Sequence, residues 1–279
     1  MNIEKIINDK QIGDSSKKVY LSLLKRLTKN KVKIPVKANE KIEYVKKALQ
    51  SYENPNTRLD FLNLFIVIRT ELNLSTEKLK EFRCQLRMEQ KSYQIGKMKK
   101  TGEDLMKYEN FEKALNDCFD KDEWKKYIVN YLMMNFGVRN KDLNLSVIKF
   151  KKEIKEGENF LLFKKDKVLY IRDDYKTQST YGTKTHEITD SKFVTSVKKV
   201  GFGKLITDQQ ISNGLRKLYI NQMAEAKIFK MVIDFLYSNN DSESIKKLAD
   251  NRGTSLSVVK DFYNVNSTGN PIDKAMSMK

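Results

Sequence analysis

Residues 252–263 have the sequence Arg252-Gly-Thr-Ser-Leu-Ser-Val-Val-Lys-Asp-Phe-Tyr263. A glycine followed by Thr254 and Ser255 is typical of a tight turn, and a serine before an apolar segment favours the start of a helix. The stretch therefore predicts a turn and a short helix over residues 255–263 that ends at a tyrosine. A tyrosine side chain can act as a covalent nucleophile, which makes Tyr263 a candidate catalytic residue.

Three short motifs precede this stretch: Gly137-Val-Arg139 with Asp142-Leu143, Tyr175-Lys176-Thr177, and Asn213-Gly-Leu-Arg216. The planar guanidinium of arginine binds two phosphate oxygens at once and stays charged. Such cations stabilise the charge that builds on a phosphate during transfer. Two arginines, a lysine and a C-terminal tyrosine are the groups that phosphodiester transfer needs when neither a metal nor a nucleotide is used.

In this order and spacing, the motifs resemble those of the tyrosine recombinases, the family of the phage-type integrases. Gly137-Val-Arg139 resembles the family's Gly-Leu-Arg turn, and Asn213-Gly-Leu-Arg216 resembles its His-x-x-Arg box. Residues 252–255 resemble its Leu-Gly-His-Ser turn, and Tyr263 follows Thr254 at the family's usual interval of nine residues. Asn213 and Thr254 stand where the family usually carries histidine.

The resemblance implies a chemical role for each matched residue. Tyr263 would attack the scissile phosphate and form a 3′-phosphotyrosyl link, while Arg139 and Arg216 stabilise the phosphorane. Lys176 would protonate the leaving 5′-hydroxyl, with Lys184 as the alternative. The complete set of catalytic residues that it implies is Arg139, Lys176, Asn213, Arg216, Thr254 and Tyr263.

The resemblance also implies the domain organisation. It predicts a mainly α fold with a small antiparallel β-sheet, which is an α+β class. Residues 1–95 would form a basic, four-helix, SAM-like core-binding domain, and residues 103–264 the catalytic domain. Residues 96–102, which combine two glycines with three lysines, are the expected linker, and residues 265–279 the expected C-terminal tail.

Apolar periodicity predicts the individual elements. In the N-terminal part, it predicts helices over residues 16–27, 40–51, 59–72 and 75–93. Further along, it predicts helices over residues 122–134, 208–235 and 242–250, a helical turn over residues 140–145, and strands over residues 159–163, 168–172 and 185–188.

The charge of the chain indicates a polyanionic partner. The sequence has 54 Lys and Arg against 36 Asp and Glu, a net charge of +18, and a pI near 9.6. Residues 1–100 alone hold 23 basic and 11 acidic residues. A basic excess concentrated in one part of a chain favours a nucleic-acid-binding module. The abundance of Lys, Asn and Ile hints at an AT-rich viral or mobile-element genome.

Several other classes of site and location are disfavoured. Cys84 and Cys118 are isolated, which argues against a disulfide scaffold and a zinc site. His186 is the single histidine, and a position on a strand surface is expected for it. No apolar run approaches the roughly 20 residues of a membrane span, and the N-terminus lacks a signal-peptide core. We therefore expect an intracellular protein without metal, cofactor or membrane contact.

These observations predict a site-specific DNA recombinase or integrase that acts on double-stranded DNA, by resemblance as a homotetramer. A type IB topoisomerase, which relaxes DNA as a monomer, is an alternative with the same chemistry. A non-catalytic DNA-binding relic of a recombinase is the alternative that Asn213 and Thr254 suggest. A basic structural protein without a nucleic-acid role is the remaining possibility.

Overall fold

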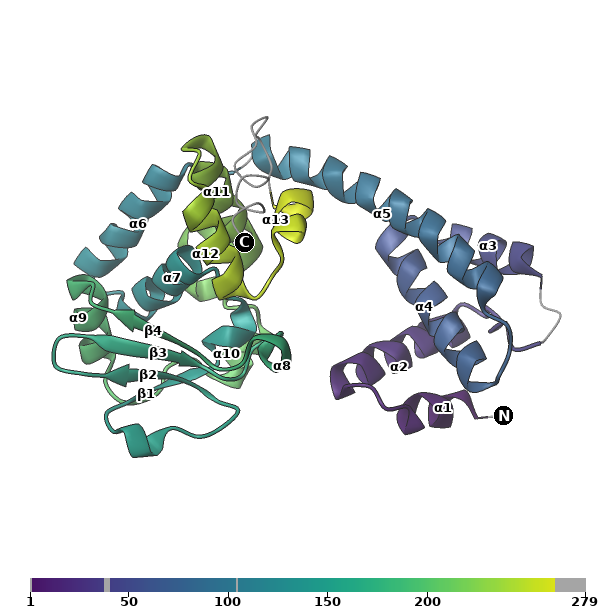
Figure 1. Ribbon diagram of the computed structural model, residues 1–279, viewed down its shortest axis with the longest axis horizontal. Helices are drawn as coiled ribbons and strands as arrows, with labels where there is room; N and C mark the ends of the chain where they lie inside the picture. The colour runs from purple at the N-terminus through teal and green to yellow at the C-terminus, as the bar shows by residue number, and fades with distance from the viewer. Residues whose placement is uncertain (1, 38–40, 104, 264–279) are drawn as a thin grey trace. The chain divides into compact units, whose positions relative to one another are not determined.

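The computed structural model describes residues 2–37, 41–103 and 105–263 of the chain. The chain divides into two compact units, Met1–Gly96 and Lys97–Lys279. Figure 1 shows the helices and strands of both units, and each unit has its own apolar core. The tail predicted over residues 265–279 lies outside the described residues. None of the described helices combines the length and the apolar composition that a membrane span requires.

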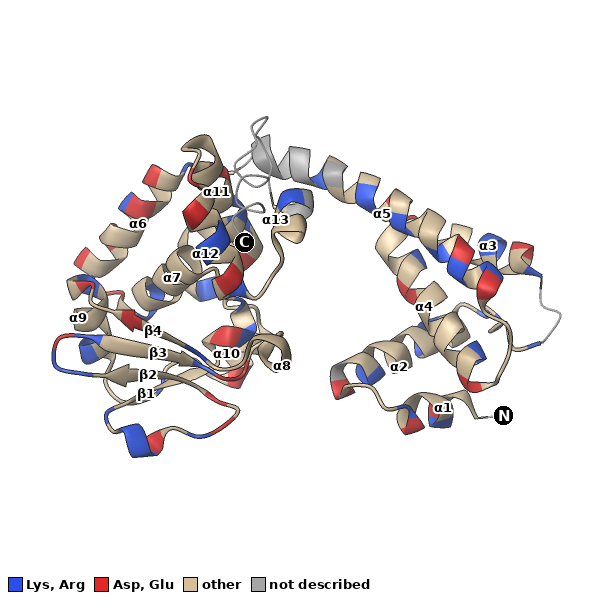
Figure 2. Cartoon of the chain, viewed as in Figure 1, with Lys and Arg blue, Asp and Glu red and all other residues tan. Residues whose placement is uncertain are grey.

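The first unit is helical, and α4 (Pro55–Glu71) forms its centre. Buried residues occupy more than half of the circumference of α4, as expected of a helix packed against several others. Helices α1 (Ile3–Asp9), α2 (Asp14–Lys29) and α3 (Ile42–Gln50) contact it, and α5 (Glu77–Glu103) follows. Lysine and arginine recur along α2, α3 and α5 (Figure 2).

Two helical features of this part differ from the prediction. Helix α1 is an additional helix before the four that the sequence predicted. Helix α5 continues past Tyr93 through the segment 96–102 that was expected to be a linker. One glycine costs a helix only about 1 kcal/mol relative to alanine, and lysine is a good helix former, so this segment does not stop the helix. The boundary between the compact units falls inside α5, after Gly96.

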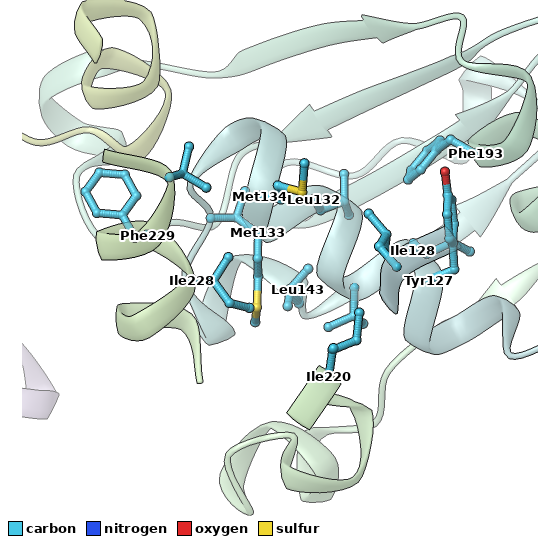
Figure 3. Close-up of a cluster of buried hydrophobic side chains, with 14 of the residues drawn as sticks. Tyr127, Ile128, Leu132, Met133, Met134, Leu143, Phe193, Ile220, Ile228 and Phe229 are labelled. Carbon is cyan, nitrogen blue, oxygen red and sulfur yellow. The ribbon is translucent and has the colours of Figure 1, made fainter. Parts of the chain in front are cut away.

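Helix α7 (Trp124–Phe136) is the central element of the second unit. It contacts α6 (Tyr108–Asp120), α9 (Ser191–Val200), α11 (Glu225–Ser238) and α12 (Ser242–Arg252). Side chains of α7 pack among those of its neighbours (Figure 3), and the labelled members are Tyr127, Ile128, Leu132, Met133, Met134, Leu143, Phe193, Ile220, Ile228 and Phe229.

A five-stranded sheet belongs to the second unit, in the order β4-β3-β2-β1-β5. Its strands are β1 (Leu145–Ile148), β2 (Asn159–Phe163), β3 (Val168–Arg172), β4 (Lys184–Ile188) and β5 (Gly203–Lys204). The prediction of an antiparallel sheet is wrong at one place, because β1 and β2 are parallel. The other pairs are antiparallel, and β3 and β4 align so that the last residue of β3 faces the first of β4.

The continuous helix predicted over residues 208–235 is also wrong. The chain instead forms α10 (Asp208–Ser212), the short helices η3 (Arg216–Leu218) and η4 (Ile220–Gln222), and then α11. Positive φ angles break the helix: Gly214, Leu215, Asn221 and Gln222 have φ of 71°, 55°, 45° and 59°. Residues in this left-handed region cannot continue a right-handed helix.

A fully buried ion pair joins the sheet to the turn after α7. The Arg172 guanidinium, at the end of β3, lies 2.6 Å from Asp142 Oδ2, and both side chains are completely buried. The same carboxylate oxygen accepts a hydrogen bond of 2.9 Å from the backbone N–H of Arg139. Asp142 belongs to the short helix η1 (Asn140–Leu143), so this pair fixes the position of the chain around Arg139.

Replacement of Asp142 by Ala leaves the Arg172 charge buried without its partner. Loss of one member of a buried pair costs about 3–5 kcal/mol, and we expect the free energy of unfolding to fall by that amount in chemical denaturation. The matched control is Glu187→Gln, which breaks the exposed pair between Lys167 and Glu187. We expect little change there, and equal losses in the two variants would contradict the structural importance of the buried pair.

Candidate functional site

Arg139 lies directly after the end of α7. Gly137 ends that helix with φ 60° and ψ 26°, a left-handed conformation that favours glycine, and a Cβ there would lie 2.8 Å from the Phe229 ring. The chain then turns and places Arg139 before η1. The Arg139 side chain is half-buried, and its NH1 donates a hydrogen bond of 2.6 Å to the carbonyl oxygen of Arg252.

The turn after α12 has the form of a Schellman motif. Gly253 has φ 63°, its N–H donates to the carbonyl of Asp250, and the N–H of Thr254 donates to that of Ala249. A Cβ at Gly253 would collide with the Thr177 hydroxyl, so this close approach requires glycine. Beyond Gly253, Thr254 is half-buried and connects the turn to the next helix.

The predicted capping of the last helix is confirmed. The Ser255 hydroxyl accepts a hydrogen bond of 3.3 Å from the N–H of Val258, at the start of α13 (Leu256–Phe262). Tyr263 follows as the C-cap of α13 and is half-buried. Its ring meets the Phe229 ring edge-on at a centroid distance of 4.7 Å, and the Arg252 guanidinium carbon lies 5.4 Å from its centre.

Four consecutive carbonyl oxygens, those of residues 250–253, accept hydrogen bonds from side chains of other segments. The donors are Lys184 Nζ to Asp250, Arg172 NH1 to Asn251 at 2.5 Å, Arg139 NH1 to Arg252 at 2.6 Å, and Thr177 Oγ1 to Gly253 at 3.2 Å. The carbonyls at a helix C-terminus lack partners within the helix and carry partial negative charge. This end of α12 therefore gathers three cationic side chains.

The electrostatics around Arg139 favour an anionic ligand. Burial lowers the pKa of the Arg139 guanidinium, and the nearby charge of Arg252 lowers it further, while Asp142, Tyr263 and Glu225 act in the opposite direction. Among the residues that the structure describes, no carboxylate lies within ion-pair distance of Arg139. Its remaining N–H groups can therefore bind phosphate oxygens.

Lys176 and Lys184 occupy different environments. Lys176 is exposed on the turn between β3 and α8 (Gln178–Tyr181), and the neighbouring Thr177 attaches this turn to Gly253. Lys184 opens β4, is half-buried and faces Arg172 across the strand pair. Burial lowers the pKa of Lys184, and the Arg172 charge adds to the effect.

Asn213 and Arg216 lie at α10 and η3, and α10 contacts η1, the short helix that follows Arg139. Both side chains are exposed, and they line an open groove of about 680 Å³ along α10 and η3. Leu215 between them is buried, and Tyr219 Oη donates to Asn140 Oδ1 at 2.7 Å. Within the described residues, no hydrogen bond joins Asn213 or Arg216 to Arg139.

The structure thus brings together the segments that carry Arg139, Lys176, Thr254 and Tyr263, while the side chains of Asn213 and Arg216 are exposed in the groove along α10 and η3. Sequence reasoning missed the buried cations of Arg172 and Arg252 and their carboxylate partners, Asp142 and Glu225. A signal for one of them was present, since Arg252 opens the motif that contains Thr254. For Arg172, the sequence shows only an arginine at the end of an apolar strand, which does not indicate a buried cation.

His186 departs from the expectation of a surface residue. It lies on β4, is half-buried, and its ring centre is 4.8 Å from that of Phe136. Burial lowers the pKa of His186 to about 4, and the charges of Arg172 and Lys184 contribute. The imidazole is therefore neutral near pH 7. In the described part of the chain, no three His, Cys, Asp or Glu side chains gather as metal ligands would.

Comparisons with known proteins add one distant likeness. No family model matches the sequence, and no curated protein matches it. Among solved structures, the chain is similar to the crystal structure of XerA recombinase, with a TM-score of 0.37 and 8% sequence identity over 98% of this chain and 94% of that chain. A TM-score of this size does not establish a shared fold, so the functional argument depends on the site itself.

The low pKa of His186 predicts a pH-dependent stability. As the pH falls below about 6.5, His186 in the unfolded chain takes up a proton. In the folded protein, His186 takes up this proton only near pH 4. Stability is therefore lost as the pH falls from about 6.5 towards 4. We expect His186→Phe to reduce this loss, measured as the melting temperature of both proteins between pH 7 and 5. Parallel pH profiles for the two proteins would contradict the prediction.

Proposed function

We propose that this chain is a tyrosine recombinase that cleaves and rejoins duplex DNA through a covalent bond to Tyr263. The observation that carries the proposal is the C-terminal end of α12, where Lys184, Arg139 and Thr177 donate to the carbonyl oxygens of residues 250, 252 and 253. The helix that ends at Tyr263 begins directly after this turn. Cations and a nucleophile from separate segments thus lie around one place, as phosphoryl transfer requires.

The proposed reaction exchanges one phosphoester bond for another. The Tyr263 hydroxyl loses its proton to solvent as its oxygen bonds to the scissile phosphorus, the bond from phosphorus to the 5′-oxygen breaks, and the leaving oxygen takes up a proton from a lysine. Arg139 binds the non-bridging oxygens and stabilises their charge in the transition state. Because the phosphotyrosyl bond retains the energy of the phosphodiester, attack by a 5′-hydroxyl rejoins the strand without an external energy source.

Lys184 is the proton donor that the geometry favours over Lys176. Its ammonium lies 4.9 Å from the Tyr181 ring centre and 5.5 Å from that of Tyr175, in a partly desolvated position close enough to Arg139 to feel its charge. Desolvation makes a lysine a stronger acid, which suits protonation of an alkoxide near neutral pH. Lys176, on its exposed turn, has no comparable environment.

Asn213 and Arg216 complete the proposed constellation from the groove on α10 and η3. Their exposure leaves both side chains accessible to a DNA backbone. Gly214, between them, has a φ of 71°. We propose that Arg216 reaches the phosphate once DNA is bound, with Asn213 and Thr254 as neutral hydrogen-bonding groups.

Duplex DNA is the proposed partner, and the net charge of +18 supports it. Phosphate contacts would dominate the affinity and make it strongly salt-dependent. Exchange between two duplexes requires four strand cleavages, and each chain offers one Tyr263, so the proposal includes four copies on DNA. Supercoil relaxation by a monomer would instead indicate a type IB topoisomerase, and binding without any adduct would indicate a non-catalytic relic.

The first test is a covalent trap. Nicked suicide duplexes that carry candidate sites release a short strand after cleavage and so prevent rejoining. We expect wild type to form an adduct that survives denaturing electrophoresis, and Tyr263→Phe to form none, because the nucleophile is gone. Tyr181→Phe removes the hydroxyl of an exposed tyrosine, 44% accessible, and is the matched control. An adduct that persists in Tyr263→Phe would contradict the assignment.

A second test separates the two lysines. We expect Lys184→Met to slow cleavage about 100-fold, within the usual range for loss of a general acid, and Lys176→Met to slow it much less. A bridging 5′-phosphorothiolate leaves as a thiolate and needs no proton, so it should restore the rate of the Lys184 variant. If the phosphorothiolate restored the cleavage rate of Lys176→Met alone, Lys176 would be the general acid instead.

A further inference from the structure

Arg252 is a buried arginine within the turn that precedes α13. It is 2% exposed, so it cannot contact DNA. Its guanidinium NH1 donates a hydrogen bond of 2.6 Å to the carbonyl of Gly137, and its NH2 lies 3.1 Å from Glu225 Oε1. Burial of a charge is unfavourable unless it is paired and hydrogen-bonded, and this site provides both.

Arg139 and Arg252 each donate to a backbone carbonyl in the turn that carries the other. Arg139 donates to the carbonyl of Arg252, and Arg252 donates to the carbonyl of Gly137, two residues before Arg139. We refer to this reciprocal pair of hydrogen bonds as the arginine clasp. Because both bonds join the same two turns, displacement of either turn disturbs the orientation of the Arg139 side chain.

The same guanidinium extends the clasp to Tyr263. Its central carbon lies 4.3 Å from the centre of the Phe229 ring and 5.4 Å from that of Tyr263, which is within the range of cation–π attraction. Phe229 in turn packs edge-on against Tyr263 and touches Gly137, where a Cβ would not fit. Arg252 therefore links the orientation of Arg139 to that of the Tyr263 ring.

Glu225 completes the arrangement. Its other carboxylate oxygen accepts a hydrogen bond from the backbone N–H of Asn140, the residue after Arg139. The carboxylate offsets the charge of Arg252 and anchors the chain beside Arg139. Arg139 itself stays without a carboxylate partner among the described residues, so its charge remains available to a phosphate.

From these contacts we propose that Arg252 is a positioning residue that holds Arg139 and Tyr263 in the geometry for attack on the phosphodiester. The proposal rests on the proposed function, since it concerns the rate of that reaction. Misplacement of a reacting group by about 1 Å can cost about 100-fold in rate. The matched place in the recombinase motif carries leucine, so this use of arginine follows from the contacts of this chain.

The test measures single-turnover cleavage at saturating suicide duplex, DNA affinity and melting temperature for Arg252→Met and Arg252→Lys. We expect Arg252→Met to cleave about 10- to 100-fold more slowly, with unchanged affinity, at a temperature where it is fully folded. Arg252→Lys should recover part of the rate because it keeps the charge and a donor. The matched control is Arg69→Met, which removes a 5% exposed arginine that donates to backbone carbonyls in the first unit.

A second measurement is independent of activity. Proteins labelled with 3-fluorotyrosine give a ¹⁹F resonance for Tyr263, assigned by its loss in Tyr263→Phe. We expect Arg252→Met to shift this resonance and Arg69→Met to leave it in place.

The possible results of these experiments distinguish the positioning proposal from the proposed function. A wild-type cleavage rate in folded Arg252→Met, or an unmoved Tyr263 resonance, would overturn the positioning proposal alone. Absence of an adduct in wild type on every substrate would overturn the proposed function. If wild type forms no adduct but the Tyr263 resonance still shifts in Arg252→Met, the arginine clasp is a structural contact only. The claim that Arg252 positions catalytic residues would then be wrong.

Discussion

The carbonyl oxygens at the C-terminal end of α12 are the feature on which the candidate site depends. A helix leaves its last carbonyls without internal partners, and these groups carry the negative end of the helix dipole. Here the carbonyls of residues 250–253 accept hydrogen bonds from Lys184, Arg172, Arg139 and Thr177. The donors come from β4, from β3, from the turn after α7 and from the segment between the two strands. These acceptors hold three cations close together despite the repulsion between their charges.

The distribution of acidic groups explains why positive charge remains at the site. Asp142 is occupied by the fully buried Arg172, and Glu225 by Arg252. Arg139 and Lys184 bond instead to neutral carbonyl oxygens. A neutral acceptor fixes the direction of a cationic side chain without neutralising it, so the two side chains stay charged and oriented. A phosphate bound as we propose would therefore meet preorganised donors, which is the arrangement that stabilises developing negative charge.

Local signals in the sequence predicted several parts of this arrangement. Gly137 at the end of an amphipathic helix, the glycine turn at residue 253 and the Ser255 cap all depend on neighbouring residues, and the structure contains each of them. Strands β2, β3 and β4 followed from their apolar pattern. Helix α9 was missed although Phe193 and Val197 lie at helical spacing on its buried face.

Features that depend on distant partners could not be predicted in this way. The parallel pairing of β1 with β2, the breaks between α10 and α11 and the burial of Arg252 are set by tertiary packing. The sequence alone also could not distinguish Lys176 from Lys184 as the proton donor, because both lysines follow strand β3 in the chain. The partial burial of Lys184 and its hydrogen bond to the Asp250 carbonyl distinguish it from the exposed Lys176. The order of the motifs predicted which segments to consider, and the fold determined which side chains meet.

The most direct test of the account is identification of the residue that carries DNA after cleavage. A trapped adduct, digested with nuclease and protease, can be mapped by mass spectrometry among the 13 tyrosines of the chain. The account predicts a nucleotide remnant on Tyr263. A remnant on any other residue would contradict it, because no other tyrosine ends the helix that follows the α12 turn.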